Sequence, residues 1–175
     1  MKSKPIKLTS TSYALLALLD RFGELTSYEI KDALETSIEN FWPVPHTTAY
    51  QEPARLASGG YLSARQEKSG RRRRRYALTD AGREALRAWA DDPVAAPPQL
   101  RDEMLLKIFA GADPDPLVEE RIAWYRQKIH EYEGLLAAVK LAPGWAGPEL
   151  TLRAGIDYYR RMIEMIEDIA AEQDR

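Results

Sequence analysis

The chain has 175 residues, of which 45% are hydrophobic and 30% are charged, and it contains no cysteine. This composition is typical of a soluble globular protein with one domain or two small ones. The lack of cysteine excludes disulfides and thiol chemistry. No stretch approaches the ~20 apolar residues that a membrane span needs, and the basic N-terminus has no leader-type cleavage site. We therefore expect a cytoplasmic protein with no membrane partner.

The net charge of −2 is unevenly distributed along the chain. Residues 1–90 hold 15 Lys/Arg against 10 Asp/Glu, a net of +5, whereas residues 91–175 hold 10 against 17, a net of −7. A basic first half joined to an acidic second half indicates that the first half meets a polyanion.

The first sixty residues predict three short helices. The first spans 11–21 and has an apolar face of leucines. The second runs from 28 to about 39 after a capping Thr26 or Ser27. Pro43 and Pro45 then form a turn, and the third helix begins at His46 and ends near the Ser58-Gly59-Gly60 sequence.

A hairpin and a fourth helix follow. Strand-like segments at 61–67 and 71–78 flank the turn signal Lys68-Ser69-Gly70. The fourth helix starts at 79–82, and we expect its Leu86 and Trp89 to point inward. Three compact helices followed by a basic hairpin predict a winged helix-turn-helix over residues 1–92. The segment 93–98, with three prolines in six residues, predicts a linker.

The second half, 99–175, predicts an all-helical domain, so the fold class is mainly α with a small β-hairpin wing. A short helix is expected at 99–110. Two longer helices carry apolar residues at alternating steps of 4 and 3, as in helices that pack at a shallow angle. These stripes are Val118, Ile122, Tyr125, Ile129, Tyr132, Leu136 and Val139, then Leu152, Ile156, Tyr159, Ile163, Ile166 and Ala170.

The last helix carries a second apolar row in addition to its stripe. Its members are Tyr158, Met162, Met165 and Ile169. Two antiparallel helices cannot bury both faces alone, so we interpret this row as a dimerisation surface. The alternative is that it packs on the winged domain of the same chain.

Two regions of the first half carry candidate DNA-binding residues. Guanidinium groups on a projecting hairpin suit phosphate oxygens or a narrow minor groove, and a solvated loop is the alternative. A helix N-terminus suits phosphate, while Gln and Arg side chains read base edges. The wing candidates are Lys68, Arg71, Arg72, Arg73, Arg74 and Arg75. The third-helix candidates are His46, Thr47, Thr48, Tyr50, Gln51 and Arg55, where Tyr50 is alternatively a half-buried anchor. Thr26, Ser27 and Lys31 are candidates for backbone phosphates, with capping as a second role for the two hydroxyls.

Several motifs together resemble the PadR family of bacterial transcriptional regulators. They are Thr26-Ser27-Tyr28-Glu29-Ile30, the segment from Phe41 to Tyr50, the segment from Arg55 to Leu62, and the segment from Arg74 to Gly82, which fits the family's Tyr-x-Leu-Thr-x-x-Gly junction. The C-terminal half resembles the subfamily with an extended dimerisation domain. The resemblance implies a homodimer, mostly a repressor, whose third helices and wings bind a palindromic operator. Some members are released from DNA by phenolic acids or flat aromatic drugs.

The third helix departs from this family pattern. The family usually has proline directly after the tyrosine, whereas here the order is Tyr50-Gln51-Glu52-Pro53. A proline inside a helix removes a hydrogen bond and crowds the preceding turn, so we expect a kink or a later start of the regular helix. We also expect Glu52 to place an acidic group close to the DNA phosphates.

Aromatic residues of the second half are candidates for an effector site, since they can stack on a flat ligand. Those on the packing stripe are better explained as core. Trp124 lies off the stripe and Trp145 lies in a Pro/Gly loop, so these two are the predicted ligand-binding residues. The alternative is that they too are structural.

Three other function classes were weighed. An enzyme is disfavoured because the chain has two histidines, His46 and His130, and no glycine-rich phosphate loop or clustered metal ligands. We predict no catalytic residue, no metal and no cofactor. The remaining alternatives are a helical adaptor that binds a protein and an architectural DNA-binding protein with little sequence preference.

Overall fold

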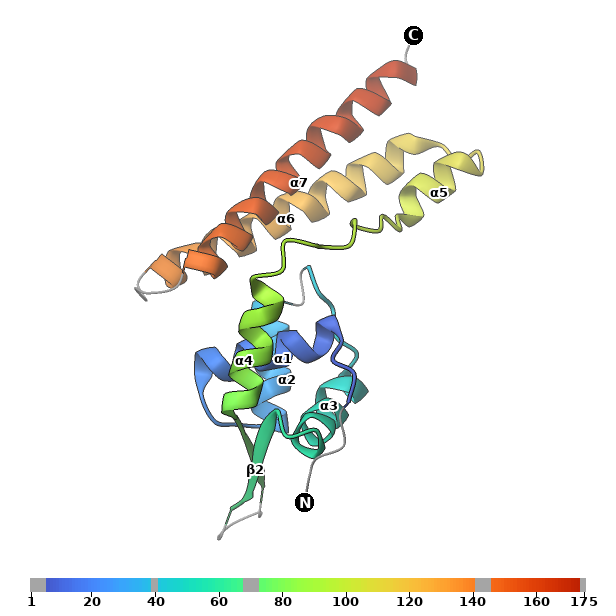
Figure 1. Cartoon of the computed structure of the whole chain (residues 1–175). Helices are drawn as coiled ribbons and strands as arrows, with labels where there is room; N and C mark the ends of the chain where they lie inside the picture. The colour runs from blue at the N-terminus through green and yellow to red at the C-terminus, as the bar shows by residue number, and fades with distance from the viewer. Residues whose placement is uncertain (1–5, 39–40, 68–72, 141–145, 174–175) are drawn as a thin grey trace. The chain divides into compact units, whose positions relative to one another are not determined.

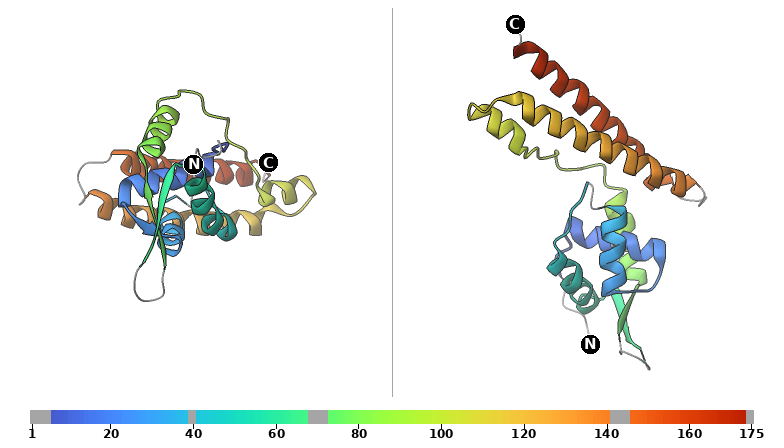
Figure 2. Two further views of the ribbon diagram at one scale, coloured as in Figure 1. Left: turned by 60° about the horizontal axis from the view of Figure 1, so that its bottom comes forward. Right: turned by 180° about the vertical axis from the view of Figure 1, so that it is seen from behind.

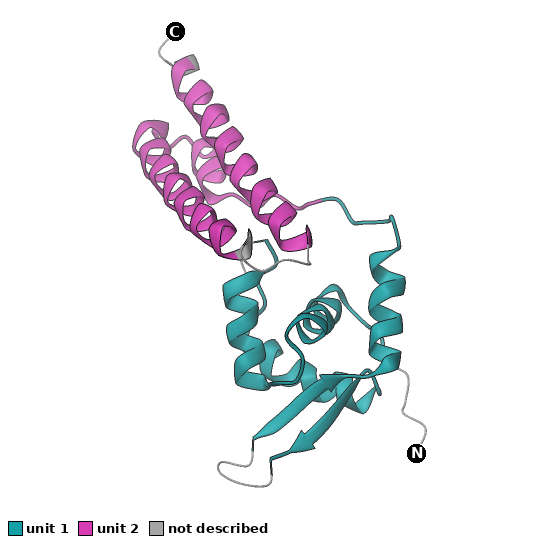
Figure 3. Ribbon diagram, turned by 90° about the vertical axis from the view of Figure 1, so that its left-hand side faces the viewer, with its two compact units in different colours: residues 1–97 teal, residues 98–175 magenta. Residues whose placement is uncertain are grey.

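The computed structural model describes residues 6–38, 41–67, 73–140 and 146–173 (Figure 1). The chain divides into two compact units, Met1–Pro97 and Pro98–Arg175 (Figure 3). Residues 92–102, which include the predicted linker, form neither helix nor strand. Each unit is described separately below.

The first unit is a winged helix, as the sequence predicts. Its elements are α1 (Ser10–Phe22), β1 (Leu25–Thr26), α2 (Ser27–Ser37), α3 (His46–Ser58), β2 (Leu62–Gln66), β3 (Arg74–Leu78) and α4 (Asp80–Ala90). The strands β2 and β3 extend away from the helices in each view (Figures 1 and 2). The two-residue strand β1 was not predicted. It pairs antiparallel with β3, and so the sheet has the order β1-β3-β2.

The sheet register places alternate side chains of β3 in the core. Leu62 of β2 lies opposite Leu78, and Leu25 of β1 lies opposite Tyr76. Tyr76 and Leu78 are buried, while Arg74, the first residue of β3, is exposed. Because side chains alternate along a strand, the same hairpin contributes both to the core and to a polar surface.

The core of this unit collects apolar residues from three helices and the sheet. Its buried members are Leu15, Leu16, Leu18, Leu19, Ile30, Leu34, Ala49, Leu56, Leu62, Tyr76 and Leu78. The expectation that Trp89 points inward is wrong. Its ring is about half exposed and stacks on Tyr13, with 4.7 Å between ring centroids and 5° between planes. The side chain lies on the last turn of α4, and α1 covers one ring face only.

Threonine side chains begin three of these helices. The hydroxyls of Thr9, Thr26 and Thr79 accept hydrogen bonds from backbone amides of the first turns of α1, α2 and α4. Gly82 in α4 allows a close approach to the sheet, because a methyl group at this position would lie 2.3 Å from the Tyr61 carbonyl oxygen. These local features fix α4 against the base of the hairpin.

The second unit contains α5 (Glu103–Phe109), α6 (Pro114–Lys140) and α7 (Ala146–Gln173). The two long helices pack along one another (Figures 1 and 3). The predicted stripes are confirmed, since Val118, Tyr125 and Tyr132 of α6 and Ile156, Tyr159 and Ile166 of α7 are buried. The helix expected at 99–110 is shorter, because Asp102 caps it and accepts a hydrogen bond from the Met104 amide at 2.8 Å.

The interface between α6 and α7 is rich in tyrosine. The hydroxyls of Tyr132 and Tyr159 lie 3.4 Å apart, and the rings of Tyr125 and Tyr159 stack at 5.3 Å. Burial raises the pKa of Tyr132 well above the ordinary range of a phenol. Tyr132 therefore stays neutral and contributes to packing.

Candidate nucleic-acid interface

The outward face of α3 carries four of the six residues of this helix that were predicted to contact DNA. His46, Thr47, Tyr50 and Gln51 are exposed, and Thr48 is half-buried. The opposite face, formed by Ala49, Glu52, Pro53 and Leu56, is buried against the rest of the unit. The helical spacing therefore brings these candidates together on one surface.

The N-terminus of α3 has no side-chain cap. Pro45 precedes the helix, and its carbonyl oxygen accepts from the amides of Thr48 at 2.9 Å and Ala49 at 3.1 Å. The earlier amides of the first turn, those of His46 and Thr47, have no intrahelical acceptor, as at the start of any helix. Such amides and the positive end of the helix dipole favour an anion.

A carboxylate on α2 organises the polar side chains around this helix end. Glu35 forms an ion pair with Lys31, and its other oxygen lies 3.5 Å from His46 Nε2. The hydrogen bond with Glu35 raises the pKa of Lys31, so the ammonium group stays charged. Together with Leu34, Val44 and Ala49, these three residues line a small pocket between α2 and α3.

The sequence reasoning missed Tyr28. This side chain, in the first turn of α2, is 63% exposed. The sequence could have indicated its exposure, because Tyr28 directly follows the polar pair Thr26-Ser27 and precedes the first core residue of the helix. Tyr28 of α2 and Tyr50 of α3 are thus both exposed aromatic residues of the first unit.

Thr26 has the capping role that was weighed as an alternative. The residue is buried, and its hydroxyl accepts from the Glu29 amide at 3.3 Å, while the Glu29 carboxylate accepts from the Thr26 amide at 2.7 Å. These reciprocal bonds form a capping box. The neighbouring Ser27 is half-buried in the first turn of α2.

The arginine run of the wing divides into residues with different environments. Lys68, Arg71 and Arg72 lie outside the described residues. Arg73 and Arg74 are exposed, and the guanidinium of Arg74 lies 5.8 Å from the centre of the Tyr76 ring. Guanidinium groups in such positions are accessible to phosphate.

Arg75 is held inside an ion cluster at the base of the hairpin. Its guanidinium lies 3.3 Å from Glu24, 3.7 Å from Glu29 and 3.5 Å from Glu67. Arg65 of β2 adds a 2.8 Å contact to Glu24, and hydrogen bonding from Arg65 lowers the pKa of Glu24. We call these five residues the wing-base cluster. Because three carboxylates surround Arg75, the cluster joins the hairpin to the start of α2.

For α3, the later helix start expected at Pro53 is wrong, and so is the expected position of Glu52, while a kink at Pro53 stays a prediction. The helix runs from His46 to Ser58 with Pro53 inside it and buried, and it does not begin after the proline. Glu52 is 8% exposed and is turned away from the outward face. Its carboxylate accepts from Ser12 Oγ at 2.7 Å and from Arg55 Nε at 2.7 Å and Nη2 at 2.6 Å. An internal partner for this carboxylate could not be seen from helix spacing alone.

Arg55, predicted to read bases, makes contacts within the protein. Besides Glu52, its guanidinium donates to Ser12 Oγ at 2.9 Å and to the Lys7 carbonyl oxygen at 3.0 Å. Burial alone would raise the pKa of Glu52, but hydrogen bonds from Arg55 and Ser12 hold it below its ordinary value. The carboxylate is therefore charged and fully paired at neutral pH.

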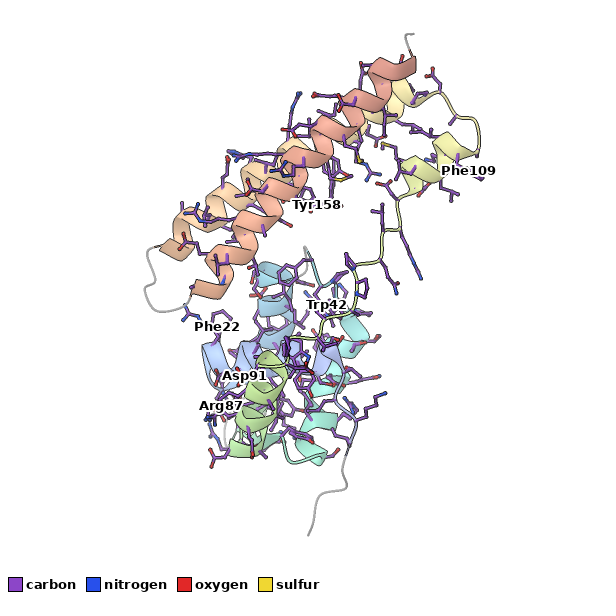
Figure 4. The ribbon with its side chains drawn as sticks, turned by 45° about the horizontal axis from the view of Figure 1, so that its top comes forward. Phe22, Trp42, Arg87, Asp91, Phe109 and Tyr158 are labelled. Atoms are coloured by element: carbon purple, nitrogen blue, oxygen red, sulfur yellow. The ribbon has the colours of Figure 1, made fainter. Side chains whose placement is uncertain are left out.

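The C-terminal candidates lie on the two long helices. Trp124 is half-exposed and meets the edges of Tyr125 and Tyr159, while Trp145 lies outside the described residues. Tyr158 is 50% exposed and Met165 is 38% exposed, while Met162 and Ile169 are half-buried. Tyr158 and the exposed Phe109 of α5 are shown in Figure 4. Tyr158 and Met165 of the second apolar row are thus left exposed, whereas Met162 packs against the core of this unit.

Comparison with known families accounts for both units. Residues 15–88 match the transcriptional regulator PadR-like family, and residues 100–173 match the C-terminal domain of virulence activator alpha. The winged-helix unit belongs to the PadR-like family of transcriptional regulators. The winged helix followed by a helical C-terminal region, which the sequence predicts, is the architecture of this family's solved structures.

Individual PadR-like proteins are similar over nearly the whole chain. The negative transcriptional regulator PadR of Bacillus subtilis is 25% identical over 178 residues, which cover 93% of this chain and 97% of that protein. The crystal structure of B. subtilis PadR in complex with operator DNA matches with a TM-score of 0.79 at 23% identity, covering 95% and 99% of the two chains. The structure of the same protein in complex with p-coumaric acid matches with a TM-score of 0.73 at 24% identity, covering 94% and 98%.

Two kinds of feature are absent from the residues that the structure describes. No helix among them is long and apolar enough to cross a membrane. No group of three or more His, Asp or Glu side chains in the same residues is arranged to hold a metal ion.

Proposed function

We propose that this PadR-like regulator binds duplex DNA as a homodimer at a palindromic operator and represses transcription. In this proposal residues 1–92 form the DNA-binding domain and residues 99–175 the dimerisation domain. The observation that carries it is the exposed face of α3, with its uncapped N-terminus, on the same unit as a hairpin that bears five consecutive arginines. A winged helix with these features places one helix in the major groove and its hairpin on the backbone or minor groove.

The residues of the proposed DNA-binding surface fall into two groups with different roles. Lys31, Tyr28 and the first-turn amides of α3 suit phosphate oxygens, which position the protein without reading sequence. Gln51, on the outward face of α3, has the amide group that pairs with adenine in the major groove. The wing residues Arg73 and Arg74 add positive charge, which attracts DNA of any sequence. His46, Thr47, Tyr50 and Ser27 complete the proposed surface, whereas Thr26 and Arg75 act within the protein.

The dimer is proposed to form through the second apolar row of α7. In this row Tyr158 and Met165 are exposed, Met162 and Ile169 are half-buried, and Phe109 of α5 is 88% exposed. Contiguous exposed apolar residues on long helices are typical of a subunit interface. A two-fold dimer also accounts for a palindromic operator, since each protomer meets one half-site.

We further propose that an aromatic acid releases the protein from DNA. The support is the p-coumaric acid complex of B. subtilis PadR, which is similar over 94% of this chain. Trp124 remains a candidate ligand-binding residue because its ring is half-exposed beside Tyr125 and Tyr159. Trp145 is the second candidate.

The salt dependence of DNA binding tests the proposed surface. If a dimer neutralises about 6–10 phosphates, the log of the affinity falls against the log of salt with a slope of about −0.9 per phosphate. Replacing Arg73 and Arg74 with alanine removes charges that lie on the wing, so the slope should become shallower. The matched control is the double variant Arg83→Ala and Arg87→Ala on α4, which removes the same charge outside the interface. Equal slopes for wild type and the wing variant would show that these arginines do not contact DNA.

A further inference from the structure

Among the described residues of the first unit, Glu52 is the one charged residue that is buried as a whole, at 8% exposed. It stands in α3, the proposed recognition helix, between the outward-facing Gln51 and the buried Pro53. Burying a carboxylate without partners costs several kcal/mol, roughly the stability of a small domain, so such a group needs strong partners. Three hydrogen bonds from Ser12 and Arg55, all between 2.6 and 2.7 Å, supply them here.

The donors of Arg55 are nearly all used within the protein. A guanidinium has five N–H groups in a fixed fork. In this structure Nε donates to Glu52, one Nη1 donor reaches the Lys7 carbonyl oxygen, and Nη2 donates to both Glu52 and Ser12. Four of the five donors are thus engaged. Bidentate recognition of guanine needs two free donors side by side, which Arg55 does not have.

These contacts join α3 to a distant part of the chain. Ser12 belongs to α1, forty residues before Glu52, and Lys7 precedes that helix. Ser12 is itself completely buried. The contacts therefore hold the buried face of α3 at a defined depth and rotation on α1, while the opposite face carries Tyr50 and Gln51 outward.

We propose that Glu52, Arg55 and Ser12 form a clamp that sets the position of α3, and that DNA sequence discrimination depends on this clamp. Arg55 is then a positioning residue that acts through the helix and does not contact a base. The proposal rests on the proposed function. The clamp also predicts that removing the charge of Glu52 lowers discrimination. Charge alone predicts the opposite direction, because removing a negative charge from a DNA-binding helix should strengthen binding.

The test uses the full-length protein and two duplexes of equal length. One duplex is selected by the wild type from a random-sequence library, and the other is an unrelated sequence. The ratio of the two affinities measures discrimination, and the salt slope measures phosphate contacts. The variants are Glu52→Gln, which keeps the shape and removes the charge, Arg55→Gln, and the double variant. Glu84→Gln, an exposed carboxylate of α4 outside the clamp, is the matched control.

The clamp predicts that each single variant lowers the discrimination ratio about tenfold or more, which corresponds to losing at least one good base contact. The double variant should have a discrimination ratio no lower than that of either single variant, since both substitutions break the same clamp. The salt slope and the Glu84→Gln protein should match wild type. If Glu52→Gln does not fold, Ser12→Ala, which keeps the charge pair, should lower the ratio in the same direction.

Two results would overturn the clamp. In the first, Arg55→Gln changes the preference at a single base pair while Glu52→Gln discriminates as wild type does, which would make Arg55 a base reader. In the second, the two single effects add in the double variant. A wild-type protein that shows no preference between the duplexes would instead refute the proposed function, so the two failures are distinguishable.

Discussion

At the scale of single residues, Glu52 of α3 is joined to Ser12 of α1 and to Arg55 by three short hydrogen bonds. As an acidic residue on a DNA-binding helix it is expected to repel phosphate, yet its carboxylate is buried and paired with Arg55 and Ser12. The reversal depends on Ser12, which lies on another helix, and no local pattern reveals that contact. The same is true of Arg75, whose charge is matched by the carboxylates of the wing-base cluster.

The pairing of Glu52 makes its contribution to stability dependent on pH. Because the folded protein holds the pKa of Glu52 below its ordinary value, the unfolded chain binds the proton more readily. The stabilisation is therefore complete above the unfolded pKa of about 4.3 and is lost as the pH falls through the lower folded value. We expect the free energy of unfolding to fall less between pH 7 and pH 3 in Glu52→Gln than in wild type.

Urea unfolding at the two pH values checks this difference. Glu24, Glu29 and Glu131 also have lowered pKa values, but they act in both proteins and cancel in the comparison. Glu84→Gln serves again as the control and should follow wild type. A parallel decline of wild type and Glu52→Gln would mean that the folded state does not stabilise the charged form of Glu52.

At the scale of elements, the helices follow from apolar spacing and capping residues. The leucine face of α1, the Thr26 cap of α2 and the 4-3 stripes of α6 and α7 are all readable in the sequence. The strand β1 is not, because two residues carry no periodicity and form a strand only through pairing with β3. Trp89 was misplaced because an apolar side chain on a helix face does not show how far the neighbouring helix extends.

The packing of α6 on α7 gives a test with an internal control. A methyl group at Gly155 of α7 would lie 2.6 Å from the Tyr132 ring, whereas one at Gly134 of α6 would meet nothing within 4 Å. Gly155→Ala should therefore destabilise the protein by about 1–3 kcal/mol through overpacking. Gly134→Ala should stabilise it by roughly 0.5–1 kcal/mol, because alanine favours the helix.

Thermal and urea unfolding of the two variants measure these changes. Both substitutions replace a helical glycine with alanine, so helix propensity is the same and only the tertiary contact differs. Equal effects of the two substitutions would contradict the close contact between Gly155 and Tyr132.

At the scale of the whole molecule, the proposed binding to a palindromic operator requires two protomers. Replacing Met165 with glutamate puts a charge in the second apolar row of α7, and a charge in an apolar interface is costly without a partner. We expect this variant to sediment as a monomer at concentrations where wild type is a dimer, and to bind operator DNA at least tenfold more weakly. Ala171→Glu adds the same charge at an exposed position about 120° around α7 from Met165, by helical spacing, and should remain dimeric. If the Met165→Glu protein remains dimeric, the subunit interface does not include this position of α7.

The most direct test of the account is binding to DNA in competition. Purified protein is mixed with a labelled duplex from upstream of its own gene, with excess unrelated duplex, at two salt concentrations. The account predicts a complex that survives the competitor, contains two protomers per site and weakens steeply as salt rises. Equal competition by every duplex would contradict a sequence-specific regulator and favour an architectural DNA-binding protein. Absence of any complex at low salt would contradict DNA binding itself and favour a protein partner for the arginine run.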